Sequence, residues 1–170
     1  RISSGLRVQP EILLKKRVAP KPLSFPTEHL DVVRDGMNLV VNGAGTAVRS
    51  KLQLENITMA GKTGTAQVRR IAGAQRGQSG AWKYRDHGLF VCFAPVAAPR
   101  YAASVVIEHG MGGARAAAPI AKDVLTFLYD RAQAMASLEA LEVGWGGNIE
   151  QRMAAKYATF QRQPAAPPPL

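Results

Sequence analysis

The first strong pattern in the chain is helical. Between residues 28 and 42, apolar side chains recur three or four positions apart, which is the spacing of one face of an α-helix. Thr27 is a suitable N-cap and Asn42-Gly43 a suitable end, so we expect an amphipathic helix over residues 28–42. The apolar positions are Leu30, Val33, Met37, Val40 and Val41.

The segment before this helix has a weaker pattern. Residues 1–18 alternate between polar and apolar positions, which indicates short strands or a hairpin. Three prolines then favour an extended linker, at Pro20, Pro22 and Pro26.

Three later segments have the composition of strands. Residues 56–68 contain threonine and valine, which favour a strand, although Gly61 and Gly64 interrupt them, as expected where another group comes close to the backbone. Residues 87–94 and 101–108 are stronger strands, and the six residues between them suit an antiparallel hairpin. A parallel nucleotide-binding sheet would need a helix in that connection. The sequence therefore predicts an α+β fold, an antiparallel sheet flanked by helices.

The C-terminal part of the chain is expected to begin with a helix. Pro119 suits its first turn, and the pattern continues to about residue 136. We expect residues 1–136 to form one structural portion and residues 137–170 a weakly folded tail, disordered from about residue 162. The side chains expected to face the sheet are Ile120, Val124, Phe127, Leu128 and Met135.

The charge of the chain is strongly basic, with 22 Lys and Arg against 12 Asp and Glu. Residues 1–22 and 69–86 hold much of the excess. Neither stretch forms a basic amphipathic helix or interleaves aromatic residues for stacking on bases. We therefore favour solvated charge near an anionic surface and expect no nucleic-acid partner.

Cysteine and histidine point to no metal or other cofactor. Cys92 lies in an apolar run, where a buried, inert thiol is expected. The three histidines lack the spacing of metal ligands. His87 and His109 border predicted strands, and we interpret them as hydrogen-bonding residues of turns.

One short motif carries candidate chemistry, Lys62-Thr63-Gly64-Thr65 within the predicted strand at residues 56–68. A lysine supplies a positive charge, and two threonine hydroxyls can donate hydrogen bonds to a carboxylate. Gly64 leaves room for a substrate backbone beside an edge strand, where a free N–H could stabilise an oxyanion. Strand alternation places Thr63 and Thr65 on one face and Lys62 on the other. By itself the tetrapeptide is a weak signal, and an ordinary strand of small residues is the more frequent explanation of such a sequence.

The surroundings of the motif resemble the class B penicillin-binding proteins, in which Lys-Thr-Gly is a signature. The similar segments follow in the family's order and together cover about residues 5–133. Where division-type members usually carry an Asp-containing sequence, this chain has Ile107-Glu108-His109-Gly110, so it looks closest to the cell-elongation type. The segments are residues 36–41 with Gly45-Thr46-Ala47, 60–68, 85–95, and 108–113 with 116–121.

The resemblance implies part of a serine β-lactamase/transpeptidase-like domain and a peptidoglycan D,D-transpeptidase activity. Lys62 would hydrogen-bond within the catalytic constellation, and Thr63 and Thr65 would bind the carboxylate of the substrate or of penicillin. The N–H of Thr65 would form half of the oxyanion hole, and Gly64 would give the ligand room. The implied partners are stem peptides, β-lactams, and, through the longer protein, a RodA-type glycosyltransferase and other elongation proteins at the periplasmic face of the inner membrane.

Two motifs of the family are missing from this chain. None of its seven serines is followed by Lys at the third position or by Asn at the second, so both Ser-x-x-Lys and Ser-x-Asn are absent. In the family both precede the Lys-Thr-Gly strand. We therefore expect this chain to be a piece of a longer protein, with its nucleophile and any membrane anchor before Arg1, and to be inactive by itself.

Three other interpretations remain open. The chain could come from a division-type transpeptidase or from a serine β-lactamase, although Gly-Thr-Ala-Gln-Val and Phe-Ala-Pro disfavour the latter. It could also be a basic, non-catalytic binding domain, which would show appreciable affinity for duplex DNA with a steep salt dependence.

Overall fold

A computed structural model describes residues 1–8, 19–68 and 81–162 of the chain. These residues belong to two compact units, Arg1–Thr126 and Phe127–Leu170. Each unit is described here by itself.

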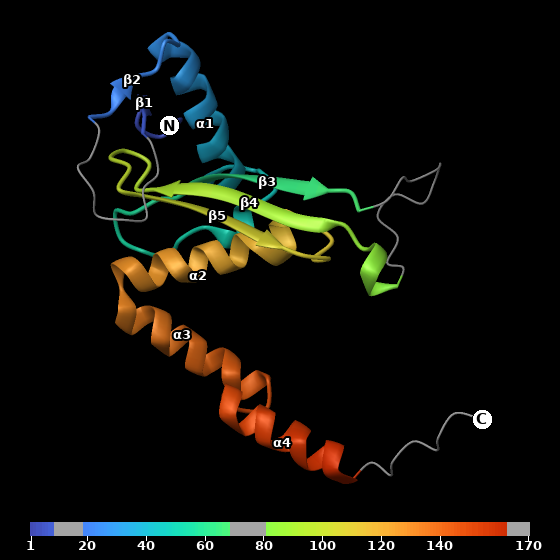
Figure 1. Ribbon diagram of the computed structural model, residues 1–170. Coiled ribbons are helices and arrows are strands. Elements are labelled where there is room, and N and C mark those ends of the chain that lie inside the picture. The colour runs from blue at the N-terminus through green and yellow to red at the C-terminus, as the bar shows by residue number, and fades with distance from the viewer. Residues whose placement is uncertain (9–18, 69–80, 163–170) are drawn as a thin grey trace. The chain divides into compact units, whose positions relative to one another are not determined.

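The first unit is built on a three-stranded antiparallel sheet (Figure 1). The strands are β3 (Ala60–Ala66), β4 (His87–Ala94) and β5 (Tyr101–Ile107), in the order β3-β4-β5. Thr63 of β3 pairs with Phe90 of β4, which in turn pairs with Val105 of β5. The predicted antiparallel sheet is confirmed, including the six-residue connection between β4 and β5.

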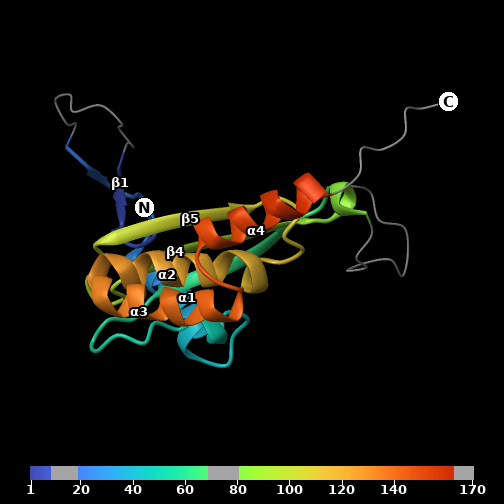
Figure 2. The same ribbon diagram turned by 90° about the horizontal axis from the view of Figure 1, so that it is seen from below.

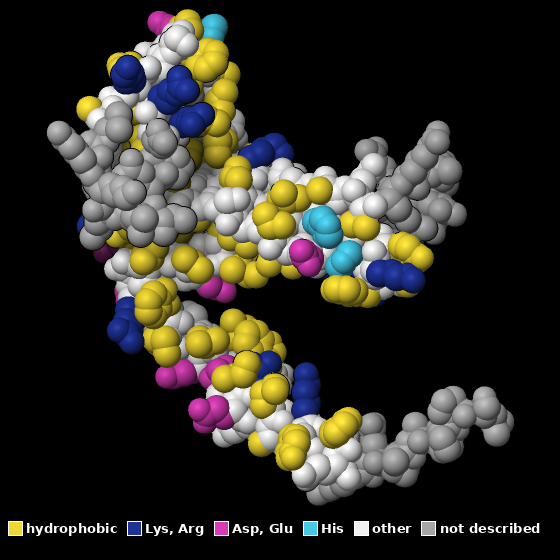
Figure 3. Space-filling model, viewed as in Figure 1, with side chains coloured by type: hydrophobic (Ala, Val, Ile, Leu, Met, Phe, Trp, Pro, Cys, Tyr) yellow, Lys and Arg dark blue, Asp and Glu magenta, His cyan; other side chains and the backbone are white. Residues whose placement is uncertain are grey.

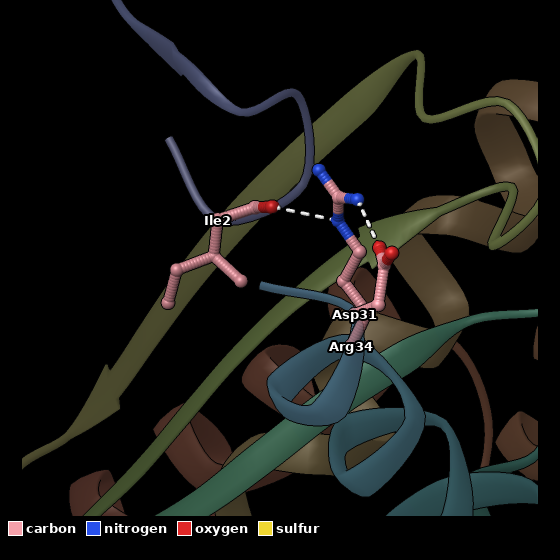
Figure 4. Close-up of polar contacts among 3 residues, drawn as sticks. All are labelled: Ile2, Asp31 and Arg34. Carbon is pink, nitrogen blue, oxygen red and sulfur yellow. Dashed lines mark hydrogen bonds and ion pairs between the residues drawn. The ribbon is translucent and has the colours of Figure 1, made fainter. Parts of the chain in front are cut away.

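The N-terminal segment forms a small separate ribbon, in which β1 (Leu6–Arg7) pairs antiparallel with β2 (Lys21–Pro22). The predicted short strand in residues 1–18 is therefore present, while residues 9–18 lie outside the described part. Arg34 of the following helix holds this segment through its Nε, which donates to the carbonyl of Ile2 at 2.9 Å (Figure 4). The same guanidinium pairs with Asp31 through Nη1 at 2.7 Å.

Helix α1 (Thr27–Asn42) matches the predicted helix closely. Thr27 is its first residue, whereas the N-cap is Pro26, so the predicted capping role of Thr27 is wrong. Met37 and Val41 are buried, and Met37 packs with Ala60 and Phe93 of the sheet. Val33 remains 44% exposed because only the C-terminal half of the predicted apolar face meets the sheet.

Short helical turns complete the connections of the first unit. The turn η1 (Val48–Ser50) follows α1, and η3 (Trp82–Tyr84) precedes β4. After β5, the π-helical turn η4 (Gly113–Ala117) leads directly into α2 (Ala118–Tyr129). In Figures 1 and 2, α1 and α2 lie on opposite sides of the sheet.

The predicted face of the last helix of this unit is wrong. Instead of the large apolar residues, α2 buries Ala118, Ala121, Leu125 and Thr126. These residues lie on one face of the helix, and Ile120 and Val124 lie on another, where they remain 42% and 48% exposed.

The second unit consists mainly of two helices, α3 (Arg131–Gly144) and α4 (Ile149–Arg162). The Asp130 carboxylate accepts a hydrogen bond from the Gln133 N–H at 2.9 Å, so α3 starts as a new helix rather than continuing α2 to residue 136. Asn148 and Gln151 cap α4 reciprocally, each side chain accepting from the other's backbone N–H. The expected weakly folded tail is thus helical through residue 162, and residues 163–170 lie outside the described part.

Candidate active site

The motif Lys62-Thr63-Gly64-Thr65 lies within β3, as predicted. The strand order places β3 at an edge of the sheet that the described residues form. Lys62 and Thr65 are exposed, and Thr63 and Gly64 are half-buried. A ligand can therefore reach the ammonium and the two hydroxyls along this strand.

The lysine of the motif makes a local contact. Its Nζ donates a hydrogen bond to the carbonyl oxygen of Thr63 at 2.8 Å. Through this contact the Lys62 side chain folds against the backbone of the next residue. The ammonium thereby reaches the backbone of Thr63, although strand alternation starts the Lys62 and Thr63 side chains on opposite faces.

A contact that the sequence did not suggest involves the hydroxyl of Thr63. It lies 2.9 Å from the hydroxyl of Thr46, which belongs to the turn between α1 and η1. The Gly45-Thr46-Ala47 segment was noticed in the sequence only as part of the family resemblance. Because the two threonines are 17 positions apart, no local pattern could have paired them.

The end of α1 is fastened to the residue that precedes the motif strand. The Asn42 amide donates to the carbonyl of Met59 at 2.8 Å and to Oδ1 of Asn38 at 2.7 Å. Met59 itself is fully buried. This tether fixes the distance between the helix and the start of β3.

On the other side of the strand, η4 approaches the backbone very closely. A Cβ added at Gly113 would meet the carbonyl oxygen of Leu89 and come within 2.9 Å of the backbone nitrogen of Gly64. A Cβ at Gly88 would lie 2.9 Å from the backbone of Gly112. Glycines at these positions therefore let η4 support the motif strand through backbone contacts.

A cluster of polar and aromatic residues lies at the end of the sheet where β4 begins. The His109 N–H donates to Nδ1 of His87 at 2.9 Å, and the Trp82 and His109 ring centroids are 4.1 Å apart. The Asp86 carbonyl accepts from the Met111 N–H at 2.8 Å, and its carboxylate accepts from the Val68 N–H at 3.3 Å. The ring centroids of His87 and His109 are 5.0 Å apart, and Figure 3 shows two histidine side chains, in cyan, next to each other. The predicted hydrogen-bonding role of His87 and His109 is confirmed.

Cys92 lies on β4, where it pairs with Gly61 of β3 and Ala103 of β5, and it is buried. Burial raises the pKa of its thiol from 9.0 to about 11. The predicted buried thiol is confirmed, and its protonated form is favoured at neutral pH.

Neither a metal centre nor a membrane-spanning helix is found in the part of the chain that the structure describes. No three His, Cys, Asp or Glu residues there are grouped so that they could hold a metal ion. None of the helices there combines the length and the apolar character needed to cross a bilayer.

The antiparallel sheet with its helices and the exposed Lys-Thr-Gly edge strand are features of penicillin-binding transpeptidases. The sequence model of the penicillin-binding protein transpeptidase domain matches residues 1–126. The chain therefore belongs to this family.

Curated relatives narrow the comparison to one type of transpeptidase. The peptidoglycan D,D-transpeptidase MrdA of Acinetobacter baumannii is 41% identical over 98 residues, which are 56% of this chain. MrdA of Haemophilus influenzae is 32% identical over 99 residues, which are 57% of this chain. The matched regions make up only 14% and 15% of those two proteins.

Solved structures give the same family. Penicillin-binding protein 2 of Helicobacter pylori, in a complex with MreC, aligns with a TM-score of 0.63 and 30% identity, over 78% of this chain and 23% of that one. The same protein in another structure aligns with a TM-score of 0.60 and 31% identity, over 77% of this chain and 22% of that one.

Proposed function

We propose that this chain is the substrate- and penicillin-binding portion of a peptidoglycan D,D-transpeptidase that cross-links stem peptides during cell elongation. The observation that carries the proposal is the exposed edge strand β3, on which Lys62, Thr63 and Thr65 are accessible. The nucleophilic serine is supplied by the rest of a longer protein, which we call the full-length enzyme.

The donor substrate ends in a carboxylate, and β3 offers groups suited to it. The hydroxyls of Thr63 and Thr65 donate hydrogen bonds to this carboxylate, and the Lys62 ammonium contributes a compensating positive charge. Gly64 has no side chain that would hold the peptide away from the strand. These contacts align the donor along β3, with its scissile carbonyl beside the strand.

The chemistry is an acyl transfer in two steps. The serine oxygen attacks the carbonyl of the penultimate D-alanine, the terminal D-alanine leaves with a proton on its amine, and an ester is formed. An amine from a neighbouring stem peptide then attacks this ester and releases the serine. The N–H of Thr65 forms part of the oxyanion hole that stabilises both tetrahedral intermediates. In β-lactams the leaving nitrogen stays attached through the ring, so the acyl-enzyme lasts.

The partners proposed for the full-length enzyme follow from the same assignment. The Helicobacter pylori relative has been solved with MreC, and an MreC-type protein is therefore our first candidate. A RodA-type glycosyltransferase is a second, because cross-linking requires newly polymerised strands. With this assignment, the proposed site of action is the periplasmic face of the inner membrane.

Fluorescent penicillin tests the proposal on the full-length enzyme. We expect a covalent label that persists for many minutes, and Lys62→Ala should slow its formation about 100-fold. Lys51→Ala removes an exposed lysine outside the motif and should leave the rate unchanged. Rapid loss of the label would instead indicate a β-lactamase. No labelling, together with tight and strongly salt-dependent DNA binding, would support a non-catalytic basic domain.

A further inference from the structure

We propose that Thr46 is a positioning residue for the acyl donor, because its hydroxyl lies against the hydroxyl of Thr63 and holds it ready to donate to the donor's carboxylate. The inference rests on the proposed function. It assigns a role to a residue outside the Lys-Thr-Gly motif. The two oxygens are 2.9 Å apart, and either can be the donor.

The backbone around Thr46 is held firmly against α1. The Ala47 N–H donates to the Val40 carbonyl at 3.0 Å, and the Ala47 side chain is only 1% exposed. Gly45 lies so close to the helix that a Cβ there would collide with the backbone of Val40. Thr46 is therefore presented from a fixed turn, and its hydroxyl reaches Thr63 without ordering a flexible loop.

The direction of the hydrogen bond decides what Thr63 can do. A threonine hydroxyl has one hydrogen and two acceptor lone pairs. When the Thr63 hydrogen points to a carboxylate, its oxygen is left to accept, and the Thr46 hydroxyl is in place to donate to it. The resulting chain runs from Thr46 to Thr63 to the carboxylate, and each bond polarises the next. Thr46 thus favours the orientation of Thr63 that binds the anion.

A merely structural role would have a different signature. Thr46 is exposed, so exchanging its hydroxyl for a methyl group creates no buried unsatisfied group. The effect should pass through Thr63 alone and should vanish when the Thr63 hydroxyl is missing. A general disturbance of the turn would instead act equally with or without that hydroxyl.

A double-mutant cycle on the full-length enzyme tests the inference. The rate constant for acylation by benzylpenicillin is measured for the wild type, Thr46→Val, Thr63→Val and the double variant. Thr46→Val should lower this constant about 3- to 10-fold, as expected for the loss of one hydrogen bond. In the Thr63→Val background it should cause no further loss. Thr46→Ser keeps the hydroxyl and should stay within about 2-fold of the wild type.

Controls separate failure of the inference from failure of the proposed function. Thr58→Val makes the same exchange at another exposed threonine outside the motif and should not change the rate. If the wild type is acylated but Thr46→Val reacts at the wild-type rate, or loses as much without the Thr63 hydroxyl as with it, the positioning role is overturned. If the wild type is not acylated at all, the proposed function fails, and the inference fails with it.

Discussion

Gly113 of η4 lies directly against Gly64 of the motif strand, so closely that a methyl group at position 113 would come within 2.9 Å of the Gly64 nitrogen. The contact joins the turn before α2 to the middle of the proposed binding motif. Its neighbour Gly112 differs in this respect, because a Cβ added there would meet nothing within 4 Å. Of these two adjacent glycines, only Gly113 lies where the packing leaves no room for a side chain.

Gly113→Ala should destabilise the first unit and disturb the motif. The new methyl group meets backbone atoms, which cannot rotate away as a side chain could, and overpacking of this kind costs about 1–3 kcal/mol. We expect the unfolding temperature of the full-length enzyme to fall by about 2 °C or more, and acylation by penicillin to slow. Gly112→Ala is the matched control, and its extended φ of −171° is open to any residue. Equal effects of the two substitutions would contradict the proposed packing.

His87→Leu should weaken the end of the sheet where β4 begins. The substitution removes the acceptor of the His109 N–H in a half-buried place, and we expect a loss of about 1–2 kcal/mol in the free energy of unfolding. His87→Asn can offer its amide oxygen near the position of Nδ1 and should lose less. His29 is exposed on α1, and His29→Leu serves as the control in denaturation experiments. If His87→Leu is as stable as this control, the hydrogen bond is not stabilising.

Cys92 should resist thiol reagents while the protein is folded. With a pKa of about 11, the thiol stays protonated at pH 8, and burial blocks access to it. Labelling with a chromogenic disulfide should be slow in buffer and rapid in denaturant. Fast labelling of the native protein at pH 8 would show that β4 is more open than described.

The raised pKa of Cys92 also predicts how the stability of the fold changes with pH. Between pH 9 and about 11 the unfolded state has lost this proton and the folded state keeps it, so stability falls as the pH rises through that range. Cys92→Ala should be less stable overall but should lack this part of the decline. Parallel curves for the two proteins from pH 9 upward would contradict the assignment.

The elements that could be predicted from the sequence are those with a clear period or a local signal. Helix α1 and strands β4 and β5 were predicted to within one residue, because apolar spacing and short connections define them locally. Asp130 with Gln133 is also a local signal, a cap followed by its partner three residues on, and it was missed.

The face of α2 and the Thr46 contact could not be predicted in the same way. The large apolar residues of α2 suggested one buried face, but the helix buries the neighbouring face with Ala118, Ala121 and Leu125. Thr46 and Thr63 meet only because Ala47 and Asn42 fasten the turn and the strand to the same helix. Contacts of this kind depend on the packed fold and leave no period in the sequence.

The central claim is that the hydroxyls of β3 bind the carboxylate of the acyl donor. The most direct test compares acylation of the full-length enzyme by benzylpenicillin and by its methyl ester, for the wild type, Thr65→Val and Thr65→Ser. For the acid we predict that Thr65→Val lowers the rate constant about 10-fold or more, as expected for a hydrogen bond to a charged group, and that Thr65→Ser restores most of it. For the ester the same substitution should change the rate constant by no more than about 2-fold. An equal loss on both compounds, or none on the acid, would contradict the account.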